Sequence, residues 1–487
     1  HNGIGFDFPV LNKLWGVEID YTNVIDTLIL SRLFNPDREG GHSLAKWGET
    51  LGYNKLEFSD FNKYSEQMLV YCKKDVAITD KLYKQLRMAG DRFSKQSIVL
   101  EHRIAHIIQK QKIHGFYLDR DKAVSLFTHT KQKAQMIQRE IKQHFKPRPK
   151  FLKEVTPKYK QNGEMSRSGV MHYVDDINDI GGSFSVFEYR DFNLASPKQI
   201  IERLDECGWK PRVFTPKGSP KVCEENLETI PNTAPEPAKK LAEWKMLETR
   251  WKTVEAWLNN LDENSRVHGD VRTMGAITGR MTHSKGLELR MLAHYMRDKD
   301  YMDVVVNGDP HTVNMQAAGL TTRAQSKTFI YAFLYGAGAE KLGKVVGGNA
   351  TDGARLKKDF LNNMPSLARL INKVQRLSEV GSIEGLDGRR ILVRHQHASL
   401  NTLLQGAGAI TCKQWSICMD DYIKQEGLRA YLVNTIHDEM QFEVHVEDVD
   451  KIISASDLTM QKAGSILGVR LPLNADAKVG LNWAETH

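Results

Sequence analysis

Four side chains in the segment TRAQSKTFIYAFLYG recur at a spacing of four residues: Arg323, Lys327, Tyr331 and Tyr335. On a helix this spacing places them along one face, two cations followed by two aromatic rings. Such a face suits a nucleotide, because the cations can bind a triphosphate and a ring can stack beside the base. An amphipathic helix with its aromatic residues in the core is the commoner cause of such spacing, so both interpretations stay open.

Two adjacent acids, Asp438 and Glu439, lie in NTIHDEMQFEV between apolar runs typical of β-strands. A tight hairpin would present both carboxylates at its tip. Carboxylates at a turn can hold Mg²⁺ together with the phosphates of a substrate. A solvated turn with two acids is also common, so the motif predicts a hairpin and, on its own, indicates a metal site only weakly.

Polar donors mark the start of an otherwise apolar helical segment within LDGRRILVRHQHASLNTLLQGAGA: Arg394, His397, Asn401 and Gln405. Such donors can contact the purine N3 and pyrimidine O2 acceptors of the minor groove, which barely vary with sequence. A protein that checks base pairing without selecting a sequence would use them. Helix capping and ordinary surface contacts explain the same residues equally well.

These motifs need supporting elements, and the second half of the chain predicts long helices mixed with short strands. Apolar periodicity predicts helices over 321–335 and 398–424. The runs RILVRH and MQFEVHV are typical of strands. Gly336 follows the first helix where a C-capping glycine is expected. The combination is α+β rather than a regular alternation of strand and helix.

The first 95 residues alternate short apolar stretches, FDFPVL and VIDTLILSRLF, with a helical pattern, which predicts an α/β domain. Residues 99–143 are expected to be helical, with Asp119 as a start signal. Farther along, Ser196 before Pro197 predicts the beginning of another helix.

The segment 145–170 differs from its surroundings: it is basic, contains prolines and lacks periodic apolar residues. We expect a loop or insertion there. Five of its basic residues could bind phosphates directly: Lys146, Arg148, Lys150, Lys158 and Lys160. A solvated loop without a partner explains the same charge.

The composition bounds the class of protein. A chain of 487 residues is expected to form two or more domains. No apolar run approaches the roughly 20 residues that a membrane-spanning helix needs, and no export signal opens the chain. The five cysteines include no CxxC pair, which argues against a zinc site or a disulfide framework. A net charge of +8 is compatible with a polyanionic partner.

The order and spacing of the motifs resemble the family A DNA polymerases, and the bacteriophage replicative type most closely. The resemblance covers essentially the whole chain, and no single motif decides it. The ordered set is specific: TGR (278–280), GLELRMLAHYM (286–296), GDPHT (308–312), RAQSKTFIYAFLYG (323–336), RHQHASLNTLLQ (394–405) and HDE (437–439). The resemblance implies a right-hand polymerase of palm, fingers and thumb, preceded by a ribonuclease H-like α/β exonuclease domain.

The resemblance also implies roles at the nucleotide. Arg323, Lys327 and His311 would bind the incoming triphosphate, and Tyr331 would stack beside its sugar and base. Tyr335, with the glycine after it, would close the pocket behind the template base.

Further roles follow at the sugar, the DNA and the metals. Glu288 would pair with Tyr331 as a steric gate against a ribose 2′-hydroxyl. Asp438 would bridge two Mg²⁺ ions with Glu439 beside it, and Mn²⁺ could replace Mg²⁺. The residues expected to contact DNA are Arg280, Arg394, His397, Asn401 and Gln405.

One expected carboxylate is missing. The family carries its second metal-bridging aspartate five residues before the gate glutamate, where this chain has His283. A neutral imidazole cannot replace a bridging carboxylate around Mg²⁺. The family also has a longer segment between TGR and GLELR. We therefore expect that a segment carrying this aspartate is absent from the sequence in hand, and we assign no catalytic role to His283 or Lys285.

The start of the chain resembles the second and third motifs of a DEDDy 3′–5′ exonuclease. Asp7 in HNGIGFDFPVL and Asp75 in YCKKD would bind metal, and Tyr71 would orient the attacking water. Asn2 is a supporting polar group. The first motif, DxE, is expected upstream of His1. Without the resemblance, a helix cap and a salt bridge would explain the same residues.

The resemblance divides the chain into an exonuclease-like domain at 1–95 and a polymerase domain at 96–487. Within the latter we expect the thumb at 96–265 with a basic insertion at 145–195, the palm at 266–306 and 396–487, and the fingers at 307–395.

Expected partners are primer–template DNA, dNTPs, a processivity factor at the insertion 145–195, and a replicative helicase or primase, but no membrane. The expected location is the cytoplasm of an infected bacterial host.

Two other functions fit part of the sequence. A catalytically silent protein that binds primer–template would explain the missing aspartate and the missing DxE motif. A single-subunit RNA polymerase shares part of the motif plan. Glu288 facing Tyr331 and the exonuclease-like start argue against it, and a template-directed DNA polymerase remains the leading hypothesis.

Overall fold

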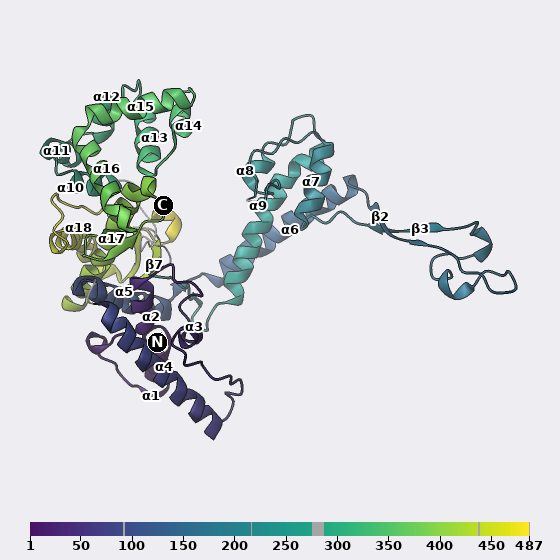
Figure 1. The fold of residues 1–487 in the computed structure, drawn as a ribbon, viewed down its shortest axis with the longest axis horizontal. Helices are drawn as coiled ribbons and strands as arrows, with labels where there is room; N and C mark the ends of the chain where they lie inside the picture. The colour runs from purple at the N-terminus through teal and green to yellow at the C-terminus, as the bar shows by residue number, and fades with distance from the viewer. Residues whose placement is uncertain (91–92, 216, 275–286, 437–438, 487) are drawn as a thin grey trace. The chain divides into compact units, whose positions relative to one another are not determined.

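The computed structural model describes residues 1–90, 93–215, 217–274, 287–436 and 439–486. The chain divides into two compact units, a larger one of residues 1–116 and 268–487 and a smaller one of residues 117–267. Figure 1 shows the elements of both units. No helix of the described residues is long and apolar enough to span a membrane.

The regular elements among the first ninety residues of the larger unit are helices joined by turns and irregular chain. They comprise a π-helical turn η1 (Gly3–Asp7), α1 (Phe8–Trp15), a 3₁₀ turn η2 (Tyr21–Asn23), α2 (Thr27–Phe34), α3 (Leu44–Thr50) and α4 (Glu66–Gly90). The apolar stretches FDFPVL and VIDTLILSRLF, which the expected α/β pattern would use as strands, therefore lie in helices.

Local capping explains this difference. The Asp26 carboxylate accepts a hydrogen bond from the Leu28 backbone N–H at 2.9 Å and so starts α2. Leu30 then packs in one cluster with Leu82 and Leu86 of α4. A short apolar run bounded by a capping acid fits a buried helix as well as a strand.

Farther along, the larger unit contains α17 (Ser399–Gln425), which contacts α5 (Lys95–His114), α10 (Leu287–Met296), α16 (Pro365–Leu377) and α18 (Val449–Ile466) (Figure 1). Its other elements are α11 (Lys299–Asn307), α12 (Pro310–Ala318), α13 (Arg323–Leu334), α14 (Ala339–Lys344), α15 (Ala350–Asn363), and the 3₁₀ turns η5 (Ser378–Val380), η6 (Gln396–Ala398), η7 (Val446–Asp448) and η8 (Trp483–Thr486). The predicted helices at 321–335 and 398–424 are confirmed as α13 and α17.

Two antiparallel hairpins complete the larger unit. They pair β5 (Ser382–Glu384) with β6 (Arg390–Leu392), and β7 (Ala430–Ile436) with β8 (Glu439–Val444). The second hairpin pairs Ile436 with Glu439, which confirms the hairpin predicted around the two acids. Both strand-like runs of the sequence, RILVRH and MQFEVHV, contribute strands.

The smaller unit is built on two long helices, α6 (Arg120–His144) and α9 (Glu236–Asn259), which pack along each other. Asp119 caps α6 through the Lys122 N–H at 3.0 Å, and Ser196 caps α7 (Pro197–Glu206), as predicted. Its other elements are α8 (Glu224–Leu227), the 3₁₀ turns η3 (Arg167–Gly169) and η4 (Ile177–Asp179), and the short strands β1 (Phe116–Tyr117) and β4 (Arg266–Val267) where the chain enters and leaves the unit. Trp209 and Leu241 lie in its core.

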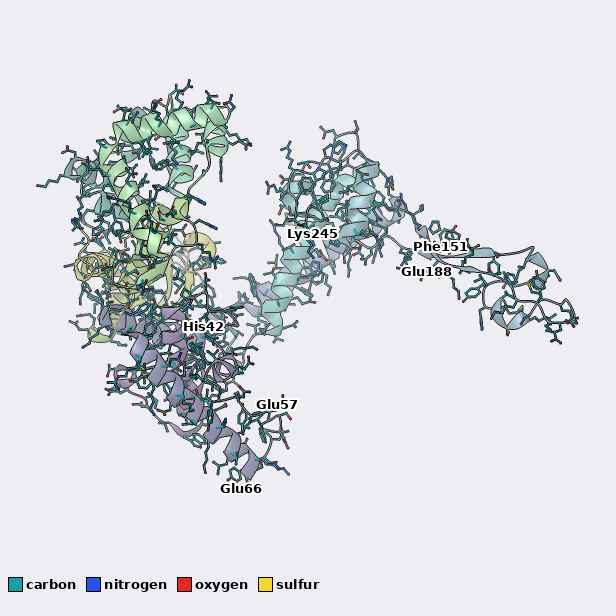
Figure 2. The ribbon with its side chains drawn as sticks, in the orientation of Figure 1. His42, Glu57, Glu66, Phe151, Glu188 and Lys245 are labelled. Carbon is teal, nitrogen blue, oxygen red and sulfur yellow. The ribbon has the colours of Figure 1, made fainter. Side chains whose placement is uncertain are left out.

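The expected loop at 145–170 contains a strand. β2 (Arg148–Val155) pairs antiparallel with β3 (Phe184–Arg190), and Phe151 lies opposite Phe187. Figure 2 labels Phe151 and Glu188 on the two neighbouring strands of this hairpin. Every residue from Arg148 to Glu154 is exposed. The strand therefore lacks the one-sided apolar alternation that reveals a strand in sequence, and its partner is some thirty residues away.

Candidate active site

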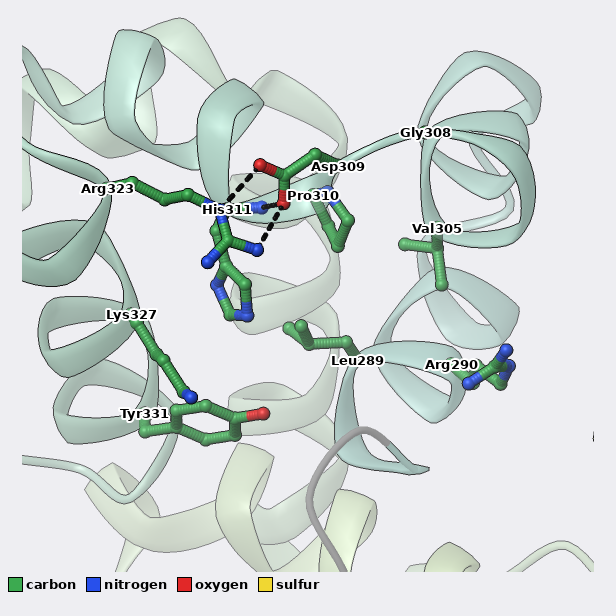
Figure 3. A pocket seen from close by; sticks show the side chains of 10 residues that line it. All are labelled: Leu289, Arg290, Val305, Gly308, Asp309, Pro310, His311, Arg323, Lys327 and Tyr331. Atoms are coloured by element: carbon green, nitrogen blue, oxygen red, sulfur yellow. Dashed lines mark hydrogen bonds and ion pairs between the residues drawn. The ribbon is translucent and has the colours of Figure 1, made fainter. Parts of the chain in front are cut away.

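A pocket of about 330 Å³ opens beside the N-termini of α12 and α13, with the start of α10 and the end of α11 completing its walls (Figure 3). Its polar lining includes Asp309, His311, Arg323, Lys327 and Tyr331. Three of these side chains come from the four-residue pattern of α13, and the other two come from the GDPHT segment. The structure thus brings together residues that the sequence separates into two motifs.

Helix α13 explains how one pattern serves both the pocket and the core. The Thr322 side chain accepts from the Gln325 N–H, and the Gln325 side chain accepts in return from the Thr322 N–H, so a capping box fixes where the helix starts. Phe329 is buried on the inner side of the helix. Lys327 and Tyr331 lie on the other side and line the pocket (Figure 3).

Asp309 organises the other edge of the pocket. It caps α12 through the His311 N–H at 3.2 Å, and its carboxylate forms a fork with Arg323, with Nε–Oδ2 2.7 Å and Nη2–Oδ1 3.0 Å. The hydrogen bonds from Arg323, and then from Thr312, hold the pKa of Asp309 well below its usual range. The acid is therefore ionised throughout the physiological pH range.

His311 is held by its backbone while its ring faces the pocket. The Ser326 hydroxyl donates to the His311 carbonyl at 2.7 Å, which ties α12 to α13. The ring lies 6.2 Å from that of Tyr331, centroid to centroid. Burial lowers the pKa of His311, and the nearby Arg323 lowers it further. Its Nδ1 is buried and has no hydrogen-bond partner in the described part of the chain.

Glu288 interacts with Tyr335 as well as with Tyr331, the residue with which it is expected to pair. Glu288 is buried, and the Tyr335 hydroxyl donates to its Oε1 at 3.0 Å. The Tyr335 ring also stacks on that of Tyr331 at 6.5 Å. Burial raises the pKa of Tyr331, and the charge of Glu288 raises it further. The glutamate therefore acts on both tyrosines, because they lie one helical turn apart.

Gly336 ends α13 as the sequence predicts. It has a φ of 76°, in the left-handed region that favours glycine. A Cβ at this position would lie 3.7 Å from the His397 carbonyl oxygen, so the end of α13 approaches η6.

The residues expected to contact DNA lie around η6 and the first turns of α17. Arg394 forms a fork with Asp37, with Nε–Oδ2 2.9 Å and Nη2–Oδ1 2.7 Å. His397 stacks on His395, with ring centroids 5.4 Å apart. Asn401 and Gln405 are half-buried on α17, one turn apart. Arg280 lies outside the described residues.

The catalytic acids are described only in part. Asp438 and His283 lie outside the described residues. The side chain of Glu439 accepts from Gln441 Nε2 at 2.8 Å, and Gln441 in turn accepts from Asn434 at 3.1 Å. The first contact lies within β8 and the second crosses from β7 to β8, so Glu439 is linked through Gln441 to the neighbouring strand.

Among the exonuclease candidates, Asp75 and Tyr71 share one neighbour, Lys55. Its Nζ lies 2.7 Å from Asp75 Oδ2 and 4.8 Å from the centre of the Tyr71 ring. Asp75 Oδ1 is buried without a hydrogen-bond partner among the described residues. Asp7 is exposed at the end of η1, and the Asn2 backbone N–H donates to Asp26.

The described residues contain no group of three or more His, Cys, Asp or Glu side chains that could hold a metal ion. Asp75 has one carboxylate oxygen, Oδ1, without a hydrogen-bond partner in this part of the chain. Of the two adjacent acids Asp438 and Glu439, only Glu439 is among the described residues.

Three polar residues of these sites were not given a role from sequence: Asp309, Lys55 and Asp37. Asp309 had a usable signal, since an acid directly before Pro310 is typical of a helix N-cap. Lys55 and Asp37 had none, because their partners lie 20 and 357 residues away.

Similarity to known proteins decides the family. The DNA polymerases of Enterobacteria phage T3 and Escherichia phage T7, each described as "DNA-directed DNA polymerase", are 30% identical to this chain over all of its length and 92% of theirs. The family model "DNA polymerase family A" matches residues 284–485. The chain belongs to the family A DNA polymerases.

The fold agrees with this assignment. A solved family A structure, "POL domain of Pol1 from M. smegmatis complex with DNA primer-template and dNTP", superimposes with a TM-score of 0.66 at 17% identity, over 90% of this chain and 78% of that one. The alignments with the phage polymerases span 649 positions, more than the 487 residues of this chain. Those relatives therefore carry internal residues that have no counterpart here.

Proposed function

We propose that this family A protein is a template-directed DNA polymerase that extends a primer, with an associated 3′–5′ exonuclease, in the replication of a phage genome. In the synthetic reaction the primer 3′-hydroxyl attacks the α-phosphorus of a dNTP, and pyrophosphate leaves. The observation that carries the proposal is the pocket that His311, Arg323, Lys327 and Tyr331 share.

The pocket suits a nucleoside triphosphate. Arg323 and Lys327 supply positive charge for the phosphates, and His311 offers ring nitrogens beside them. Tyr331 supplies a flat surface for the sugar and base, and Tyr335 stacked behind it closes the template side. Glu288, buried beneath these rings, restricts the room for a 2′-hydroxyl.

Asp438 is proposed to hold the catalytic metals, with Glu439 beside it in the sequence. Two Mg²⁺ ions, or Mn²⁺, would supply charge neutralisation to the entering and leaving oxygens when bound. The protein's own part is to orient the triphosphate and to bind the primer–template. For the latter we propose Arg280, Arg394, His397, Asn401 and Gln405.

We further propose the exonuclease at residues 1–95, the thumb at 96–265, the fingers at 307–395, and the palm at 266–306 and 396–487. The Lys55, Tyr71 and Asp75 cluster supports an exonuclease site, with Asp75 and Asp7 as metal ligands and Tyr71 directed at water. The exposed β2–β3 hairpin within the insertion 145–195 supports contact with a processivity partner. We also propose a helicase or primase contact, and a location in the cytoplasm of an infected bacterium, to which the phage origin of the relatives lends support.

The test compares two single variants of the full chain. Asp438→Asn removes the charge that the polymerase metals need, so primer extension is expected to fall by at least about a hundredfold while primer–template binding stays unchanged. Asp75→Ala is the matched control, and it should keep extension and lose degradation of single-stranded DNA.

Each outcome has a distinct meaning. Extension retained by Asp438→Asn would overturn the metal assignment. A parent chain that binds primer–template but never extends it, at any Mg²⁺ or Mn²⁺ concentration, would replace the polymerase proposal with the silent binding protein that His283 suggests.

A further inference from the structure

The nucleotide pocket, which is lined mainly by basic side chains, also contains an acid. Four basic side chains line the pocket, Arg290, His311, Arg323 and Lys327, and among the described lining residues its single acid is Asp309. A carboxylate repels the phosphates of a nucleotide, so its presence needs a physical reason.

The hydrogen bonds of Asp309 exclude a role as a direct ligand. Oδ1 accepts from the His311 N–H at 3.2 Å and from Arg323 Nη2 at 3.0 Å. Oδ2 accepts from the Thr312 hydroxyl at 2.7 Å and from Arg323 Nε at 2.7 Å. A carboxylate has about four lone-pair positions, and all four are used. Asp309 has no acceptor left for a metal ion or a substrate.

Helix capping alone does not account for the acid either. Asp298 caps the neighbouring helix α11 through the Tyr301 N–H at 3.1 Å, and the Ser366 hydroxyl donates to its carboxylate at 2.7 Å. It thus has a similar cap and a similar hydroxyl partner. Among the described residues no arginine donates a hydrogen bond to it, and the charge of Arg369 contributes to its lowered pKa only after the hydrogen bonds from Ser366 and the backbone. The fork to Arg323 distinguishes Asp309 from this second capping aspartate.

We propose that Asp309 is a positioning residue that holds the Arg323 guanidinium at the pocket before a nucleotide arrives. This inference rests on the proposed function, because the group that Arg323 would meet is the triphosphate of a dNTP. The fork uses two of the five N–H donors and leaves three for phosphate oxygens. Arg323 is 59% exposed, so without the fork its side chain would sample many rotamers and would lose that freedom on binding.

Positioning and simple charge predict opposite results for Asp309→Asn. An asparagine keeps a side-chain oxygen for the α12 cap, and it turns an NH₂ group toward the guanidinium, so the fork is lost. The variant also removes one negative charge from the pocket. If the charge alone mattered, a dNTP would bind more tightly. If Asp309 positions Arg323, the dNTP binds more weakly.

The experiment measures KM for one dNTP and kcat on a saturating primer–template with the full chain. Asp309→Asn is expected to raise KM about tenfold and to change kcat less than about twofold. Asp298→Asn removes the matched acid and should leave KM within about twofold. In an Arg323→Gln background, Asp309→Asn should have no further effect, because the group that it positions is gone.

Equilibrium dialysis with radiolabelled dGTP gives a second readout that needs no turnover. A parent chain that binds dGTP without extending a primer would refute the proposed function, yet the ratio of dGTP affinities between parent and Asp309→Asn would still judge the inference. A KM or dissociation constant that stays unchanged or falls in Asp309→Asn overturns it. An equal rise in Asp298→Asn also overturns it, since that result would trace the effect to helix capping.

Discussion

Two arginines of the larger unit form forks with aspartates in very different surroundings. Arg389 donates to Asp387 from Nε at 2.9 Å and to Glu101 from Nη1 at 2.6 Å, and its side chain is 4% exposed. Arg323 forms its fork with Asp309 at the rim of the pocket, where its side chain is 59% exposed. Both forks join a guanidinium to a carboxylate. The difference in burial determines whether the arginine can also bind a ligand.

The buried fork belongs to a closed cluster. Lys413 of α17 donates to Glu101 of α5 at 2.6 Å, and Ser94, the cap of α5, donates to the Asp387 carbonyl in the β5–β6 turn. The charges of Glu101, Asp387, Arg389 and Lys413 balance one another and join α5, α17 and the β5–β6 turn, while Glu101 Oε2 is buried without a hydrogen-bond partner among the described residues. The exposed fork fixes a single side chain and leaves donors for a ligand. A buried arginine specifies structure here, whereas an exposed one is available for binding.

The largest effect is expected when the buried cluster loses one member. Lys413→Met leaves Glu101, which is fully buried, with Arg389 as its remaining cation in the cluster. Leaving a buried charge undercompensated costs about 3–5 kcal/mol of the free energy of unfolding. Urea denaturation of the full chain, followed by circular dichroism, measures the loss.

A surface fork gives the matched control. Arg148 and Glu206 of the smaller unit pair with side chains that are 47% and 51% exposed. Arg148→Met is expected to cost less than about 1 kcal/mol. Equal losses in the two variants would mean that burial does not separate the two kinds of fork.

The sequence predicts features that depend on local contacts better than features that depend on contacts between distant residues. The α13 pattern, the capping glycine at 336 and the hairpin around Glu439 depend on neighbours within a few residues, and each is confirmed as an element of the structure. The Glu101–Lys413 pair joins residues 312 positions apart, and the β2 strand has a partner beyond an intervening loop. Nothing in the local pattern of either segment specifies its partner.

The two apolar stretches at the start of the chain show that a local pattern can also be ambiguous. Their residues suit a strand or a buried helix equally, and the outcome depends on Asp26, whose carboxylate caps α2. The catalytic assignments rest on the family resemblance more than on geometry, because Asp438 and Arg280 lie outside the described residues.

His294 is a buried titratable group that is neutral, in contrast to the buried charges around Arg389. His294 of α10 accepts from the Arg470 N–H at Nδ1, 3.2 Å away. Burial, followed by the charges of Arg470 and Arg297, lowers the pKa of His294 to about 4. Between pH 4 and 6.5 the unfolded chain binds a proton that the folded chain does not. Stability is therefore lost as the pH falls through this range.

At pH 5 the lowered pKa of His294 reduces the free energy of unfolding by about 2 kcal/mol relative to neutral pH. His294→Asn keeps an acceptor near the Nδ1 position and cannot be protonated, so it should remove that part of the acid sensitivity. The measurement is urea denaturation at pH 7.5 and pH 5. Replacement of the exposed His129 by Asn is the control and should keep the acid sensitivity of the parent chain. If His294→Asn loses as much free energy of unfolding between pH 7.5 and pH 5 as the parent chain, the His294 ring is protonated in the folded protein.

The smallest effect on stability is expected at a third fork, Arg394 with Asp37, whose side chains are 63% and 34% exposed. Asp37→Asn should change the free energy of unfolding by less than about 1 kcal/mol.

The effect of Asp37→Asn on DNA binding should be opposite in sign to the effect of Asp309→Asn on nucleotide binding. Asp309 is anchored by the α12 cap and presents its arginine to the pocket. Asp37 lies in the turn after α2 and occupies the same donors that Arg394 would use for DNA. Removing it should tighten primer–template binding by about two- to fivefold at low salt, and less at high salt, because the gain is electrostatic. Fluorescence anisotropy with a labelled primer–template measures this change. Weaker binding by Asp37→Asn would mean that this aspartate, like Asp309, holds its arginine in place for the ligand.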